Sequence, residues 1–212
     1  MPLAGPITSP DAEISALCWC GDNLVMVPQH PERFGRAEGE LHLLTVTRAE
    51  ILAVVDGAQE EPLRPRPLVL EAPGLIAGIP GWDGLEAIAS RDDTIYLAAE
   101  TERDGRMGGM LLRGRVFPGT GPLRMRVEPG RLAPVPLPHD LPNMSQEALI
   151  MAPGQVVVLF EANGVMVNPD AHAAVFDTDL NYQGTAPLDP VEYRITDATD
   201  VDADGRFWVI NY

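Results

Sequence analysis

Four segments of the chain share one pattern: a short apolar run, a polar turn and a second apolar run. Gly, Asp, Asn or Pro residues stand between the two runs of each segment, and such residues are typical of tight turns. Each segment therefore predicts a β-hairpin. The four hairpins are expected at 15–29, 86–100, 147–161 and 197–211.

A polar residue opens each hairpin, and another polar residue follows 14 positions later. Partners across an antiparallel hairpin lie at equal distances from its turn, so this spacing centres the turns on Asp22, Asp93, Gly154 and Asp204. The two polar residues are then expected directly opposite each other at the open end. The fourth hairpin is the weakest match, and its register is open to a slip of one or two residues. The pairs are Ser15 with Gln29, Glu86 with Glu100, Glu147 with Glu161, and Asp197 with Asn211.

The hairpins begin at intervals of 71, 61 and 50 residues, a spacing that favours the four-stranded blades of an all-β propeller. Their strands are apolar on both faces, as inner strands packed between neighbouring blades would be. Segments 40–46, 109–116 and 173–176 can supply outer strands, and a β-sandwich is the competing fold. Residues 47–53 form the one helix candidate, with a capping box of Thr47 and Glu50, or else a turn into a strand.

The whole chain, 1–212, is expected to form a single propeller domain with blade repeats starting near 15, 86, 147 and 197. The fourth repeat stops after its second strand, without the outer strands of a complete blade. We therefore expect a C-terminally incomplete fragment of a six- or seven-bladed propeller, and the alternative is a ring closed by the N-terminal residues.

The composition excludes several classes of function. The formal net charge is −16, which disfavours binding to nucleic acids or to anionic membranes. All 15 basic residues are arginines, so Schiff-base chemistry and a Walker A loop, which need lysine, are excluded. Cys18 and Cys20 are interpreted as small core residues. The chain has no signal peptide or membrane-length apolar run, so we expect a soluble protein, cytoplasmic unless it is a fragment of an exported one.

The polar residues at the open ends of the hairpins are the candidate site. In a propeller these ends converge near the axis, where they would form the rim of the channel mouth. The rim would contain Gln29, Glu86, Glu100, Glu147, Glu161, Asn163, Asp197 and Asn211. Like charges across a strand pair are destabilising, so the four glutamates require water, a raised pKa or a cation. Three interpretations stay open: a solvated polar ring, a Ca²⁺ or Mg²⁺ site with Glu86, Glu100, Glu147 and Glu161 as ligands, or acid–base catalysis.

Residues 200–205 match the first half of an EF-hand loop, although the apolar run that follows indicates a strand, so a hairpin turn is the preferred interpretation. The histidines are scattered, and no Gly-x-Ser-x-Gly elbow is present. No catalytic residue can be assigned on these grounds.

Segments 83–89, 147–149 and 160–164 resemble the bacterial β-propellers grouped as "esterase-like activity of phytase" proteins, with alanine at 87 and 148 where those proteins usually have glycine. The resemblance implies a six- or seven-bladed propeller, calcium sites and hydrolysis of phosphoesters or esters. Two functions follow as expectations. One is a domain that binds a ligand or partner at the channel mouth. The other is a calcium-dependent phosphoester or ester hydrolase.

Overall fold

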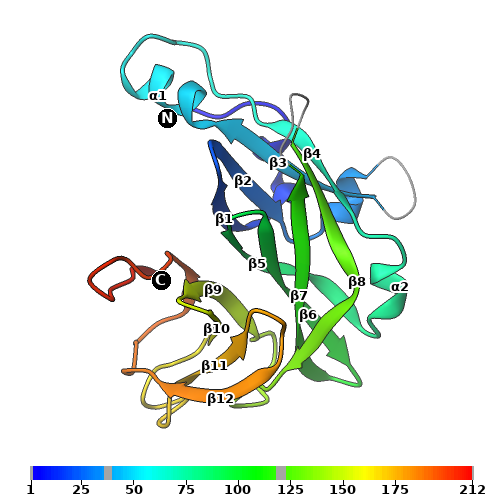
Figure 1. Ribbon diagram of the computed structural model, residues 1–212, viewed down its shortest axis with the longest axis vertical. Coiled ribbons are helices and arrows are strands. Elements are labelled where there is room, and N and C mark those ends of the chain that lie inside the picture. Colours follow the sequence, from blue (N-terminus) through cyan, green and yellow to red (C-terminus); the bar gives the residue numbers. More distant parts are fainter. Residues whose placement is uncertain (1, 36–39, 118–122, 212) are drawn as a thin grey trace.

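The chain folds into four consecutive units of antiparallel β-strands (Figure 1), here in a computed structural model that describes residues 2–35, 40–117 and 123–211. The first three units have four strands each and the fourth has two among these residues. The strands are β1 (Ile14–Cys20), β2 (Asn23–Pro28), β3 (Glu40–Thr47) and β4 (Arg66–Glu71); β5 (Trp82–Arg91), β6 (Thr94–Arg103), β7 (Arg106–Phe117) and β8 (Arg124–Val135); β9 (Gln146–Ala152), β10 (Gln155–Phe160), β11 (His172–Asp177) and β12 (Tyr182–Pro187); β13 (Ile195–Ala198) and β14 (Val209–Asn211).

The units stand side by side like the blades of a propeller. Strand β1 lies against β5, β5 against β9, β9 against β13, and β13 returns to contact β1. Three apolar cores fill the spaces between successive units, and each contains residues from the first strands of both units, among them Leu85, Leu149 and Ile195. The prediction of an all-β, propeller-like fold is confirmed, and the predicted outer strands are present as β3, β7 and β11.

The helices are short and lie at the margins of this arrangement. The predicted helix is α1 (Arg48–Val55), and the hydroxyl of Thr47 and the carboxylate of Glu50 form the capping box. The other helices are α2 (Leu75–Gly78) and the 3-10 turns at Pro6–Thr8, Pro10–Ala12 and Pro31–Phe34. Within the described part of the chain, none is long and apolar enough to cross a membrane.

The first two units are joined by their outermost strands, which the blade pattern did not predict. Strands β4 and β8 pair in parallel over a short stretch, through Leu70 with Met125 and Glu71 with Arg126. The guanidinium groups of Arg124 and Arg126 both bind the carboxylate of Glu71 beside this pair. Since an unpaired strand edge exposes a row of hydrogen-bonding groups, the pairing satisfies two such edges at once. The result is one eight-stranded sheet that curls until β1 and β5 meet.

The predicted register is wrong by one residue in the first three hairpins, and the fourth shows a slip of one residue, which its weaker pattern leaves open. Strands β1, β5 and β9 turn into their partners through two-residue turns, which are Gly21-Asp22, Asp92-Asp93 and Pro153-Gly154. A two-residue turn places its centre between two residues, whereas the predicted pairing needs a central residue. The fourth hairpin instead has a loop over 199–208. The polar residues of each hairpin are therefore not opposite partners: Glu100 pairs with Gly84, not with Glu86.

In every unit, one residue near the open end of the first strand has no partner on the second strand and forms a β-bulge. The pairing skips one residue at this place on each first strand, where the ladder bends, and on β5 it also skips Asp83. The bulged residues are Ser15, Glu86, Glu147 and Thr196. Three of these four are the polar residues that the sequence pattern places at the start of its hairpins.

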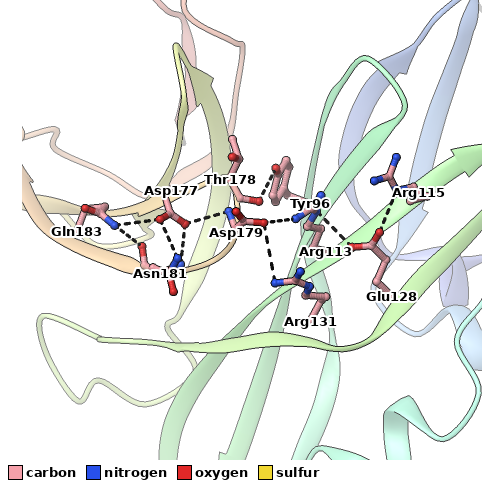
Figure 2. A network of polar contacts seen from close by, with 10 residues as sticks. All are labelled: Tyr96, Arg113, Arg115, Glu128, Arg131, Asp177, Thr178, Asp179, Asn181 and Gln183. Carbon is pink, nitrogen blue, oxygen red and sulfur yellow. Dashed lines mark hydrogen bonds and ion pairs between the residues drawn. The ribbon is translucent and has the colours of Figure 1, made fainter.

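A polar network fastens the third unit to the second (Figure 2). The hydroxyl of Tyr96 donates to the carbonyl of Thr178 at 3.0 Å, and Arg113 donates to the carboxylate of Asp179 at 2.6 Å. The turn that carries these acceptors is itself shaped by Asp177, whose carboxylate accepts the backbone N–H groups of Asp179 and Asn181, both at 2.9 Å. The contact therefore joins β6 and β7 to a preformed turn between β11 and β12.

Gly84 allows the second unit to approach the first closely. A Cβ atom at this position would lie 2.6 Å from the carbonyl oxygen of Gln29, at the end of β2. Because that neighbour is backbone, it cannot rotate away. We expect Gly84→Ala to lower the free energy of unfolding by about 1–3 kcal/mol. Gly78→Ala is the control, since nothing lies within 4 Å of its added Cβ. Urea unfolding of both variants is the measurement, and an equal effect would contradict the close contact.

Candidate functional site

Each junction between two units brings the end of one hairpin against the next unit. At the first junction the side-chain amide of Gln29 donates to the carboxyl of Glu86 at 2.8 Å. The backbone carbonyl of Gln29 also accepts the N–H of Leu85 at 2.8 Å. Ser15 is tied to the same strand, because its hydroxyl donates to the carbonyl of Leu85 at 2.7 Å. The bulge of β5 is therefore held by the first unit.

The third junction has the same backbone contact and a different side-chain pair. The carbonyl of Glu161 accepts the N–H of Ile195 at 3.0 Å, as Gln29 does for Leu85. The carboxylate of Glu161, which is 1% exposed, forms an ion pair with the guanidinium of Arg194. A buried carboxylate is compensated here by a protein cation.

The second junction places two acids together. Glu100 occupies the position that Gln29 and Glu161 hold in their own units, and the next unit presents the bulged Glu147. Glu100 is buried and Glu147 is half-buried. Burial is the main cause that raises the pKa of Glu147, and the charges of Glu161 and then Glu100 add to it. The carboxyl groups of the four predicted glutamates therefore lie within electrostatic reach of one another, both within hairpins and between units.

Burial and mutual repulsion raise the pKa values of these carboxyl groups. Burial is the main cause that raises the pKa of Glu86 to about 9, and the charges of Glu147 and Glu100 add to it. Burial, followed by the charge of Glu161, raises the pKa of Glu147 to about 8. Burial also raises the pKa values of Glu100 and Glu161. In the described residues, no group of three or more His, Cys, Asp or Glu side chains is arranged to hold a metal ion.

The remaining predicted rim residues bond to nearby backbone. The buried Asn163 donates to the carbonyl of Phe160, which closes its own loop. Asn211 donates to the carbonyl of Glu192 at 3.2 Å. Asp197 accepts the N–H of Leu17 at 3.3 Å and that of Ala198 at 2.8 Å, so it bridges β13 and β1. Burial raises the pKa of Asp197 to about 6.

A cavity of about 680 Å³ opens beside Asp197, between β1 and the β13–β14 hairpin. All four units line it, mainly with apolar side chains. The sequence pattern does not predict this site, because the first strands are apolar on both faces and are therefore expected to be buried on both. In the structure Leu17 and Trp19 lie on an exposed face of β1. The lining residues are Leu17, Cys18, Trp19, Leu24, Ile88, Ala89, Leu149, Asp197, Ala198, Thr199, Asp200, Val201, Asp202, Trp208 and Ile210.

The EF-hand-like segment forms the loop that covers one side of this cavity. The carboxylate of Asp202 accepts the backbone N–H groups of Asp204 and Arg206, both at 2.9 Å, which is the bonding of a tight turn. The carboxylate of Asp200 accepts the N–H of Met151 at 3.1 Å and thereby ties the loop to β9. These bonds agree with the turn interpretation.

Comparisons with known proteins add little to this description. No family model matches the chain, and no curated protein matches it by sequence. Among solved structures, the chain is similar to the β-propeller domain of Vanderwaltozyma polyspora Nup133, with 11% identity and a TM-score of 0.41. The likeness covers 99% of this chain and 58% of that one, so the chain spans little more than half of that domain. The propeller-like arrangement rests instead on the strand order and contacts described above.

The buried glutamates make stability depend on pH in a direction that can be tested. A carboxyl group whose pKa is raised from 4.5 to about 8 or 9 on folding contributes stability that is fully present below pH 4.5. That stability is lost as the pH rises toward 9. The melting temperature should therefore fall between pH 5 and pH 9.

We expect Glu147→Gln to remove part of this dependence, because an amide mimics the protonated acid without titrating. At pH 8.5 the variant should melt a few degrees above the unmodified protein, at about 2–4 °C per kcal/mol, and at pH 5 the gain should vanish. Glu60→Gln, at an exposed position, is the control. Equal melting curves for Glu147→Gln and the unmodified protein at pH 8.5 would contradict the buried acid cluster.

Proposed function

We propose that this chain is a binding domain on a propeller-like scaffold, and that its ligand occupies the cavity between β1 and the β13–β14 hairpin. The observation that supports this most strongly is the cavity itself. Its volume of about 680 Å³ lies within the range of about 300–1,000 Å³ that is usual for small-molecule sites. Its lining combines apolar side chains with a few polar groups, which is also typical of such sites.

The position of the cavity supports the same proposal. The first strands β1, β5, β9 and β13 all contribute to its wall, so it lies where the four units meet. Strands packed on both sides hold side chains more rigidly than loops do, and a preformed wall lowers the entropy cost of binding. The ligand would contact every unit at once.

The calcium-dependent hydrolase that the family resemblance implies stays a prediction. Such an enzyme needs ionised carboxylates around a cation. Glu161 is already paired with Arg194, and among the described residues no three His, Cys, Asp or Glu side chains are grouped to hold a metal ion. A binding function requires no such group, and we therefore prefer it.

The experiment uses the neutral fluorescent probe N-phenyl-1-naphthylamine, whose emission rises in apolar surroundings. We expect saturable binding and an affinity about fivefold lower in Leu17→Asn, since less apolar surface is then removed from water. Leu52→Asn is the matched control, because Leu52 is exposed to a similar degree (49% against 45%) and lies outside the cavity lining. Absence of saturable binding, or an equal loss in both variants, would overturn the proposal.

A further inference from the structure

The charged groups that line the cavity all have the same sign. Its ionisable side chains are those of Asp197, Asp200, Asp202 and Cys18, and the described lining contains no arginine or histidine. Asp202 is paired with Arg206 at 3.4 Å. Among the described residues, neither Asp197 nor Asp200 has an ion-pair partner within 4 Å, and both are held in place by backbone N–H groups.

Asp197 lies deepest in this arrangement. Its two carboxylate oxygens accept N–H groups from different strands, the N–H of Leu17 on β1 and that of Ala198 on β13. The carboxylate is therefore fixed at the seam where the first and fourth units meet. A positive charge bound beside Asp197 would be attracted by its carboxylate, whereas a negative charge would be repelled.

Two tryptophans provide aromatic surface at the same cavity. Trp19 is 40% exposed and Trp208 is 77% exposed. The guanidinium of Arg48 lies 4.2 Å from the ring centroid of Trp19 and covers one face of that indole, so a ligand would contact the remaining exposed surface of the ring. The backbone N–H of Trp208 donates to the hydroxyl of Thr199 at 3.0 Å, and this bond fixes the loop on which the second ring stands. Indole faces attract organic cations through the quadrupole of the ring.

We propose that the ligand of this cavity is an organic ammonium ion with an apolar body, whose charge lies beside Asp197 and whose body packs on Leu17, Trp19 and Leu149. This inference rests on the proposed function, since it names the ligand class for the same cavity. The carboxylates of Asp197 and Asp200, which have no ion-pair partner among the described residues, would attract the ammonium group. The apolar side chains that all four units contribute to the lining would pack against the apolar part of the ligand.

The test compares three probes of one shape by isothermal titration calorimetry at pH 7.5: 3-phenylpropylammonium, 3-phenylpropanol and 3-phenylpropanoate. We expect the cation to bind about tenfold more tightly than the neutral alcohol, and the anion to bind more weakly than either. If the alcohol binds as tightly as the cation, the charge inference is wrong and the proposed function stands. If none of the three binds, the proposed function fails as well.

Substitutions at Asp197 and Asp200 test whether these two carboxylates cause the preference for the cationic probe. We expect Asp197→Asn to reduce the affinity for the cation about fivefold and to leave the affinity for the alcohol unchanged. Asp200→Asn, which keeps the contact between β1 and β13, should reduce the cation preference in the same direction if Asp197→Asn impairs folding. Asp204→Asn is the control, because Asp204 belongs to the same loop, is exposed and lies outside the lining. An unchanged cation preference in both Asp197→Asn and Asp200→Asn would overturn the assignment.

Discussion

The contact between the end of one hairpin and the bulged first strand of the next unit organises the whole molecule. Backbone bonds from Leu85 to Gln29 and from Ile195 to Glu161 tie neighbouring units together at equivalent points. Because the bulge bends each first strand there, the following strands turn away and leave room for an apolar core between the units. Neighbouring units are thus joined by a repeated local contact, and the first two are joined by the β4–β8 pairing as well.

The same contact explains why so many carboxyl groups are buried in an acidic protein. The repeat places a polar side chain at both partners of each junction, and the three junctions combine them differently. An amide meets an acid at Gln29, two acids meet at Glu100, and an acid meets a guanidinium at Glu161. Among these junctions a protein cation compensates the acid at the third, whereas burial and neighbouring acids raise the pKa of Glu86 to about 9 and that of Glu147 to about 8. Stability is therefore coupled to pH at the point where the units are joined.

The cavity lies between the first and fourth units, where β1 faces the β13–β14 hairpin. Between successive units the space is filled by Leu85, Leu149 and Ile195 with their neighbours, whereas β1 and the short β13–β14 hairpin approach each other with little side-chain packing between them. Leu17 and Trp19, which would be core residues against a full neighbouring blade, line an open space. The candidate binding site is therefore apolar because its wall is formed by first strands, whose other side chains pack between units.

Local patterns in the sequence determined the hairpins, the turn positions, the capped helix and the outer strands, because each depends on residues close together in the chain. They also identified Glu86, Glu100, Glu147 and Glu161 as one set, since the repeat places them at equivalent positions. In the first three hairpins the register was decided by the two-residue turns and the bulges, which apolar runs on both faces do not specify. The cavity with Trp19 and Trp208, the partners of each acid and the pairing of β4 with β8 depend on contacts between distant units. Only the tertiary structure decides these, because a residue in a strand that is apolar on both faces does not reveal whether a neighbour will cover it.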